Sequence, residues 1–166
     1  MPHSVPVEEI MINPRDWTLL RADTPIKVAI GILRILSEDK KLERGHSTPL
    51  VLDDEYNLLG LIRLTDLLRS VRYLCDLPDK ACKLDQALRP VSDLAIPFPD
   101  SVEPEDSILK SLDIMLDHGV SLVPVLKDEK LTGIVQLNDI FDVVAALLFD
   151  EERDGAKEWI TEHLHF

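Results

Sequence analysis

An internal repeat constrains the fold of this chain more than any other feature of its sequence. Residues 49–71 read PLVLDDEYNLLGLIRLTDLLRSV, and residues 124–144 read PVLKDEKLTGIVQLNDIFDVV. Each copy runs from a proline through a short apolar stretch, an acidic turn and a second apolar stretch that contains a glycine. In both copies an aspartate follows that glycine six residues later. The chain of 166 residues therefore uses one structural unit twice.

The repeat predicts the same order of elements in both copies. The apolar stretches around Gly60 and Gly133 are short and rich in Leu, Ile and Val, which predicts paired strands joined by a turn. After each aspartate, apolar or thiol residues recur at i, i+1, i+4, i+7 and i+8, the spacing of one helix face. A further helix is expected before each strand pair, starting near Pro25 or Pro104 and, in the second copy, ending at Gly119.

These elements define the expected fold class and domain organisation. We expect an α/β (α+β) fold with two pseudo-symmetric repeats, each a small sheet packed against two helices. The first repeat is placed at residues 1–79 and the second at residues 80–149. Residues 150–166 form an acidic C-terminal tail and are a candidate for a short amphipathic helix.

Composition and charge exclude several classes of function. The chain has 18 Lys and Arg against 31 Asp and Glu, a net charge of −13, which opposes binding to nucleic-acid polymers and to anionic membranes. Its longest apolar run, residues 143–149, is too short to span a bilayer, and its N-terminus lacks the features of a secretory signal. Cys75 and Cys82 match no metal or redox spacing, so we expect reduced thiols in a cytoplasmic protein.

The two copies resemble a tandem pair of cystathionine β-synthase (CBS) domains, a stand-alone Bateman module. The resemblance covers almost the whole chain, from about Val7 to Leu148. It is carried by HGVSLVPV at 118–125, GIV at 133–135 and Asp139 in the second copy, and by STPLV at 47–51, GLI at 60–62 and Asp66 in the first. It implies two clefts between the repeats, which in this family hold AMP, ADP, ATP or S-adenosylmethionine as regulatory ligands.

The resemblance also assigns a ligand-binding role to one set of positions in each copy. Residues beside the proline would line the base, and the aspartate would accept hydrogen bonds from ribose hydroxyls beside a helix N-terminus suited to phosphate. The candidate ligand-binding residues are Thr48, Pro49, Arg63, Thr65 and Asp66 in the first copy, and Ser121, Val123, Pro124, Gln136, Asn138 and Asp139 in the second.

Two of these positions depart from the family pattern. Many nucleotide-binding copies have Thr or Ser three residues after the glycine, where this chain has Arg63 and Gln136. Neither residue supplies the small hydroxyl group. Arg63 could bind a phosphate bidentately, and it could equally fill the cleft.

Each candidate also has a purely structural interpretation. The two aspartates can stabilise the helix N-terminus electrostatically, and Thr65 and Asn138 lie where N-cap residues are expected. The two glycines are more often used for close packing than for ligand approach, and the two prolines are expected to begin strands. The pattern alone leaves these alternatives open.

No catalytic or metal-binding constellation accompanies the repeat. A His lies near a Ser in each copy, but the chain has no nucleophile elbow and no third partner at a known spacing. The sequence also lacks a glycine-rich phosphate loop and a metal-ligand spacing. We therefore expect no enzyme activity, no catalytic residue, no metal and no required cofactor.

The sequence favours a regulatory module whose conformation responds to an adenine-containing ligand. The alternative is a ligand-free scaffold with degenerate clefts that forms homodimers and binds other proteins. A homodimer and an effector protein are expected partners in either case. Residues 1–83 carry 12 basic and 13 acidic side chains, whereas residues 84–166 carry 6 and 18. This division predicts that the cleft near Arg63 and Asp66 is the better host for a phosphate.

Overall fold

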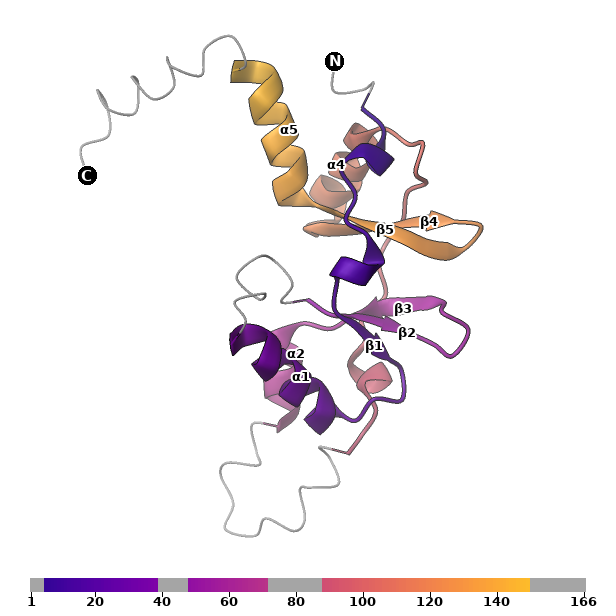
Figure 1. The fold of residues 1–166 in the computed structure, drawn as a ribbon, viewed down its shortest axis with the longest axis vertical. Helices are drawn as coiled ribbons and strands as arrows, with labels where there is room; N and C mark the ends of the chain where they lie inside the picture. Colours follow the sequence, from indigo (N-terminus) through magenta and orange to yellow (C-terminus); the bar gives the residue numbers. More distant parts are fainter. Residues whose placement is uncertain (1–4, 39–47, 72–87, 150–166) are drawn as a thin grey trace, which may run out of the picture. The chain divides into compact units, whose positions relative to one another are not determined.

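The computed structural model describes residues 5–38, 48–71 and 88–149 (Figure 1). Its helices are α1 (Ile26–Glu38), α2 (Leu64–Val71), α4 (Ile108–His118) and α5 (Leu137–Phe149). Its strands are β1 (Leu19–Arg21), β2 (Leu50–Leu52), β3 (Leu58–Leu61), β4 (Leu122–Lys127) and β5 (Lys130–Gln136). Short 3-10 helices occur at Val7–Glu9, Pro14–Asp16 and Val91–Leu94. This order confirms the mixed α/β class, while both cysteines and the predicted C-terminal tail lie outside the described residues.

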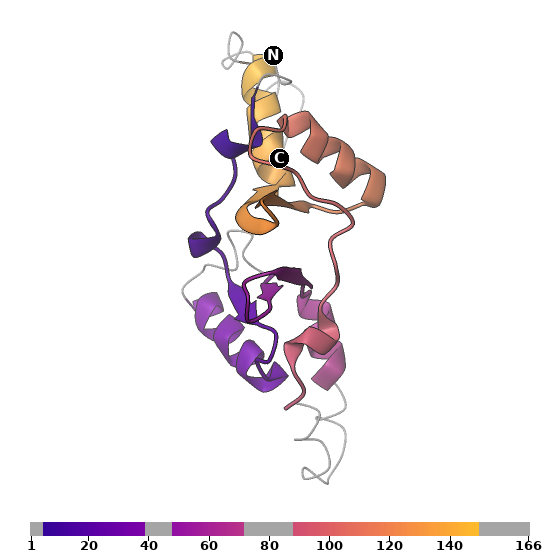
Figure 2. The same cartoon turned by 90° about the vertical axis from the view of Figure 1, so that its right-hand side faces the viewer.

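The chain divides into two compact units, which we describe separately. The first unit comprises Ile12–Pro99 and Leu126–Thr132, and it contains a three-stranded sheet in the order β1-β2-β3. Strand β1 pairs with β2 in parallel, and β2 pairs with β3 antiparallel. Helices α1 and α2 lie on one face of this sheet (Figure 1, Figure 2).

The core of the first unit follows the periodicities of its elements. Alternate residues of a strand point to opposite faces, and Ile26, Ala29 and Leu33 recur along one face of α1. The buried cluster consists of Leu20, Ile26, Ala29, Leu33, Val51, Ile62, Leu67 and Val91. Ile26, Ala29 and Leu33 form the buried face of α1, the helix that the sequence predicted to start near Pro25.

The second unit comprises Met1–Met11, Asp100–Val125 and Gly133–Phe166. Helices α4 and α5 lie on one face of the β4–β5 pair (Figure 1, Figure 2). Helix α4 is capped by Ser107, whose side chain accepts a hydrogen bond from the Leu109 amide at 3.2 Å. It ends at Gly119, which has the left-handed φ of 64° typical of a helix C-terminus, as the sequence predicted.

The turns predicted in the two strand pairs are also present. Asp128 and Glu129, between β4 and β5, both have positive φ angles, as a tight two-residue hairpin turn requires. In the other copy, the Asp53 carboxylate accepts hydrogen bonds from the amides of Glu55 and Asn57, at 2.8 and 2.9 Å. These acidic residues therefore have the turn-forming role that the sequence indicated.

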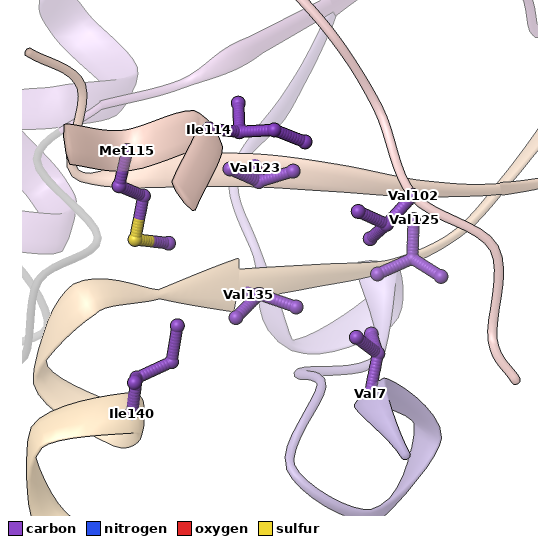
Figure 3. Packing of buried hydrophobic residues seen from close by; sticks show 8 residues of the cluster. All are labelled: Val7, Val102, Ile114, Met115, Val123, Val125, Val135 and Ile140. Atoms are coloured by element: carbon purple, nitrogen blue, oxygen red, sulfur yellow. The ribbon is translucent and has the colours of Figure 1, made fainter. Parts of the chain in front are cut away.

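Each unit includes a short segment that belongs, in chain order, to the other copy of the repeat. Val7 is fully buried in the core of the second unit (Figure 3). Its amide donates to the Asp106 carbonyl at 2.7 Å. Val91 is fully buried in the first unit, and its amide donates to the Thr24 carbonyl at 2.8 Å. The compact units therefore do not follow the predicted division at residues 79 and 80.

Candidate functional site

Asp66 lies in the first turn of α2, just after the end of β3. Its Oδ2 atom accepts a hydrogen bond from Arg63 Nε at 2.7 Å. Its Oδ1 atom accepts from Arg63 Nη2 at 3.1 Å and from Arg69 Nη1 at 2.9 Å. Both carboxylate oxygens are therefore engaged by guanidinium groups, from Arg63 just before α2 and from Arg69 in its last turn.

This pairing determines the protonation of Asp66. Its side chain is 12% exposed, whereas the side chains of Arg63 and Arg69 are 57% and 65% exposed. The hydrogen bonds from Arg63, together with the charges of both arginines, hold the pKa of Asp66 below its ordinary value, although burial opposes them. Asp66 is therefore an ionised and fully hydrogen-bonded carboxylate at neutral pH.

Asp139 occupies the same position in the second copy, in the first turn of α5 after β5. Its Oδ2 atom is buried and has no hydrogen-bond partner among the residues that the structure describes. The same is true of Nε2 of Gln136, three residues earlier. Burial, and after it the negative charge of Asp142, raise the pKa of Asp139 above its ordinary value. The second copy therefore holds a buried acceptor and a buried donor that lack partners.

The other candidates near the strands contribute mainly through their backbone. The Thr48 carbonyl accepts a hydrogen bond from Trp17 Nε1 at 2.8 Å, and the Pro49 carbonyl accepts from the Ile62 amide at 2.9 Å. The Ser121 carbonyl accepts from the Leu137 amide at 2.9 Å. These bonds fix the strand starts beside α2 and α5.

Two expectations about these residues need correction. Helices α2 and α5 begin at Leu64 and Leu137, so Thr65 and Asn138 are second helical residues and not N-caps. Pro49 directly precedes β2 as expected, but Pro124 is the third residue of β4. Strand β4 belongs to a two-stranded sheet and is therefore an edge strand, where a proline is tolerated, and the Pro124 carbonyl accepts from the Val102 amide at 3.1 Å.

Val123 and the two glycines serve packing. Val123 is fully buried in the core of the second unit, among the side chains shown in Figure 3. A Cβ atom on Gly60 would overlap the backbone carbonyl of Ile96. A Cβ atom on Gly133 would overlap the side chain of Met11. The structure thus favours the packing interpretation of both glycines.

A pocket of about 390 Å³ lies in the first unit, and the sequence did not indicate it. Its lining residues are Leu19, Leu20, Arg21, Leu52, Asp53, Asp54 and Tyr56. Arg21 Nη2 donates to Asp54 Oδ1 at 3.1 Å, and the Asp53 carboxylate accepts from the Glu55 and Asn57 amides, so each charged group of this pocket already has a partner within the chain. None of the predicted site residues lines it. The pocket joins two chain segments, residues 19–21 and 52–56, which share no motif, so no pattern in the sequence indicated it.

The described residues hold no group of three or more His, Cys, Asp or Glu side chains that could bind a metal ion. Within the same ranges, no helix has the length and hydrophobicity needed to cross a membrane. The chemistry of the candidate positions is therefore that of hydrogen-bonding carboxylate, amide and guanidinium groups.

Comparison with known proteins places the chain among relatives with the same repeat. The model of the CBS domain family matches residues 7–73 and 91–146. The "Uncharacterized protein YlbB" of Bacillus subtilis (strain 168) is 33% identical over 93 residues, which are 55% of this chain and 56% of that protein. The chain thus spans about half the length of the curated relative it matches.

Three solved structures share the fold. CBSX2 in complex with AMP has a TM-score of 0.63 and 23% identity, over 86% of this chain and 97% of that one. A putative acetoin utilization protein (AcuB) from Vibrio cholerae has a TM-score of 0.65 and 20% identity, over 89% and 96%. CbpB in complex with c-di-AMP has a TM-score of 0.66 and 14% identity, over 92% of each chain.

Proposed function

Because this chain belongs to the CBS domain family, we propose that it is a non-enzymatic regulatory module that binds an adenine-containing ligand. The ligand classes are AMP, ADP and ATP, or S-adenosylmethionine. Ligand binding would favour one of two conformations and so change the affinity for an effector protein in the cytoplasm. The location of the ligand between the two repeats stays a prediction.

One observation carries this proposal: each copy places a shielded carboxylate in the first turn of the helix that follows the glycine-containing strand. These carboxylates belong to Asp66 and Asp139. A carboxylate accepts hydrogen bonds from two hydroxyl groups at once, which suits the vicinal diol of a ribose. The complexes of CBSX2 with AMP and of CbpB with c-di-AMP, which share this fold, support an adenine-containing ligand.

A ligand panel in a thermal-unfolding assay tests the proposal. A ligand at about 100 times its Kd adds about 2.7 kcal/mol of stability, which raises the Tm by roughly 5–10 °C for a chain of this length. We expect such a shift with at least one of AMP, ADP, ATP and S-adenosylmethionine, and none with GMP. The shift should be lost in the double variant Asp66→Asn/Asp139→Asn and kept in Asp113→Asn, an exposed position on α4. Absence of any shift at millimolar adenine ligand would refute the proposal.

A homodimerisation scaffold is a second candidate function, and exposed apolar side chains favour it. Leu137, Phe141 and Leu148 recur along one face of α5 and are 37%, 69% and 69% exposed. A second copy of the chain could cover this face. Light scattering after size exclusion would then give twice the chain mass, and Phe141→Asp would give the monomer mass. A monomeric wild-type protein would contradict this function.

A further inference from the structure

The two copies of the repeat differ in charge around their equivalent aspartates. An offset of 73 residues aligns Asp66 with Asp139. The same offset aligns Arg63 with Gln136 and Arg69 with Asp142. The first aspartate therefore lies between two cations, whereas the second lies between a neutral amide and another carboxylate.

In the first copy the chain itself supplies the donors that a ligand would offer. Arg63 binds the Asp66 carboxylate through Nε and Nη2, at 2.7 and 3.1 Å, and Arg69 adds a third bond at 2.9 Å. Two parallel donors on one carboxylate are also what a vicinal diol presents. Hydrogen bonds from a cation are roughly twice as strong as those from a neutral hydroxyl. Solvent weakens these pairs, because the two arginine side chains are more than half exposed, but a ligand must displace both guanidinium groups before its hydroxyl groups can reach the carboxylate.

In the second copy the corresponding groups lack partners. Gln136 Nε2 and Asp139 Oδ2 are buried without a hydrogen bond to any described residue, an arrangement that costs free energy. Both residues are only half-buried as a whole, so a change of rotamer can present these atoms to a ligand. A hydroxyl group can satisfy both, because it donates to the carboxylate and accepts from the amide.

The surroundings of Asp139 also restrict the charge of the ligand. Among the described residues of the second unit, Lys110 is the only Lys or Arg, and its Nζ atom already pairs with Asp106 at 2.7 Å. Lys127 and Lys130, at the turn between β4 and β5, belong to the first unit, where Lys130 Nζ donates to the Glu55 carbonyl oxygen and to Asn57 Oδ1 at 3.0 and 3.1 Å. Asp142 adds a negative charge one helical turn from Asp139. Few cations therefore remain in this unit for a chain of phosphates.

We propose that the two copies are functionally unequal: Arg63 and Arg69 occupy the ligand position at Asp66, and Gln136 with Asp139 forms the position that binds a ligand. The ligand class is a nucleoside with at most one phosphate, recognised through its ribose hydroxyls. This inference rests on the proposed function. The net charges of residues 1–83 and 84–166 predicted that the site at Asp66 is the better host for a phosphate, and the inference reverses that ranking. The local hydrogen bonds outweigh the net charge of a half, because they act at contact distance.

Exchanging the two discriminating residues tests the inference. Isothermal titration with AMP is performed on the wild type, Arg63→Gln, Gln136→Arg and the control Arg34→Gln, an exposed position on α1. We expect one AMP per chain in the wild type and in the control. Arg63→Gln should bind a second AMP, whereas Gln136→Arg should weaken binding by about tenfold or more. ATP should bind the wild type more weakly than AMP does.

Each contrary outcome has its own meaning. Two equal AMP sites in the wild type, or loss of binding in Arg63→Gln alone, would overturn the inference and leave the proposed function intact. No heat with any protein or ligand would overturn the proposed function and the inference with it. Because Gln136→Arg could fold poorly, Asp139→Asn is a second variant, with circular dichroism of the ligand-free protein as the check on its fold. A folded Asp139→Asn that binds AMP as tightly as the wild type would also overturn the inference.

Discussion

Replacing Val7 by alanine should destabilise the second unit, although Val7 lies in the part of the sequence assigned to the first repeat. Its side chain is fully buried there, in the same cluster as residues such as Val102 and Val123 (Figure 3). Val91→Ala should have the reciprocal effect, because that side chain is fully buried in the first unit. The pair of variants therefore tests the exchange of segments between the two copies.

The magnitude follows from the groups that are removed. Each substitution deletes two buried carbon groups, worth about 0.8 kcal/mol apiece in transfer free energy. The cavity that remains adds to this, so we expect a loss of about 2–3 kcal/mol in the free energy of unfolding. Val28, on α1, is 48% exposed, and its replacement by alanine should cost less than about 0.5 kcal/mol. This variant is the matched control.

Urea denaturation gives the total loss, and hydrogen exchange read by mass spectrometry gives its location. Val7→Ala should accelerate exchange most in α4, β4 and β5, and Val91→Ala most in α1, β2 and β3. A Val7→Ala variant that loosens α1 and β2 while α4 and β4 stay protected would refute the exchange of segments. A loss no larger than that of Val28→Ala would refute the estimate of buried packing.

Three further comparisons test other parts of the structure. Gly60→Ala should lower stability by about 3 kcal/mol, because its Cβ would meet the backbone carbonyl of Ile96. Gly133→Ala should cost less, about 1–2 kcal/mol, because its Cβ would meet the side chain of Met11, which has to shift. Equal urea midpoints of the two variants would contradict this. Gly119→Ala should cost about 1 kcal/mol in the same assay, because alanine disfavours the left-handed φ of 64°, and an unchanged midpoint would argue against that cap. Asp66 has a lowered pKa in the folded protein, so its charge stabilises the fold above the pKa of Asp66 in the unfolded chain. This contribution is lost as the pH falls through the pKa of Asp66 in the folded protein. Asp66→Asn should therefore lower the Tm by a few degrees at pH 7, and the difference in Tm from the wild type should shrink below about pH 4. Asp139 has a raised pKa in the folded protein, so its negative charge destabilises the fold at pH 7, and Asp139→Asn should raise the Tm there. This gain in Tm should disappear as the pH falls through the pKa of Asp139 in the folded protein. Tm shifts of the same sign in Asp66→Asn and Asp139→Asn would contradict the opposite pKa shifts of the two aspartates.

Sequence alone was sufficient for most of the local structure and for the family of this protein, although it misplaced two N-caps and one strand start. The buried face of α1, the end of α4 at Gly119 and the turn at Asp128 and Glu129 all follow from periodicity and turn chemistry. These signals are read within a few residues, so they survive without knowledge of distant contacts. The repeat itself identified the CBS domain family, which the family match confirms.

Other features depend on contacts that no local pattern records. Val7 and Val91 each lie in a short 3-10 helix, too short to show a periodicity, and only the tertiary structure assigns them to a core. The candidate positions themselves could be predicted from the repeat, but not the state of their hydrogen bonds. Arg63 was equally compatible with binding a phosphate and with filling the cleft.

Sequence therefore determined which element each candidate residue occupies, and the tertiary structure decided what each side chain does there. Arg63 and Gln136 stand at the same place in the two copies. Arg63 binds its neighbouring aspartate, whereas beside Gln136 the Oδ2 atom of Asp139 has no hydrogen-bond partner in the part of the chain that the structure describes. The physical reason is that a hydrogen bond depends on distances of a few tenths of an ångström and on the burial of both atoms. Composition and spacing along the chain do not specify either quantity.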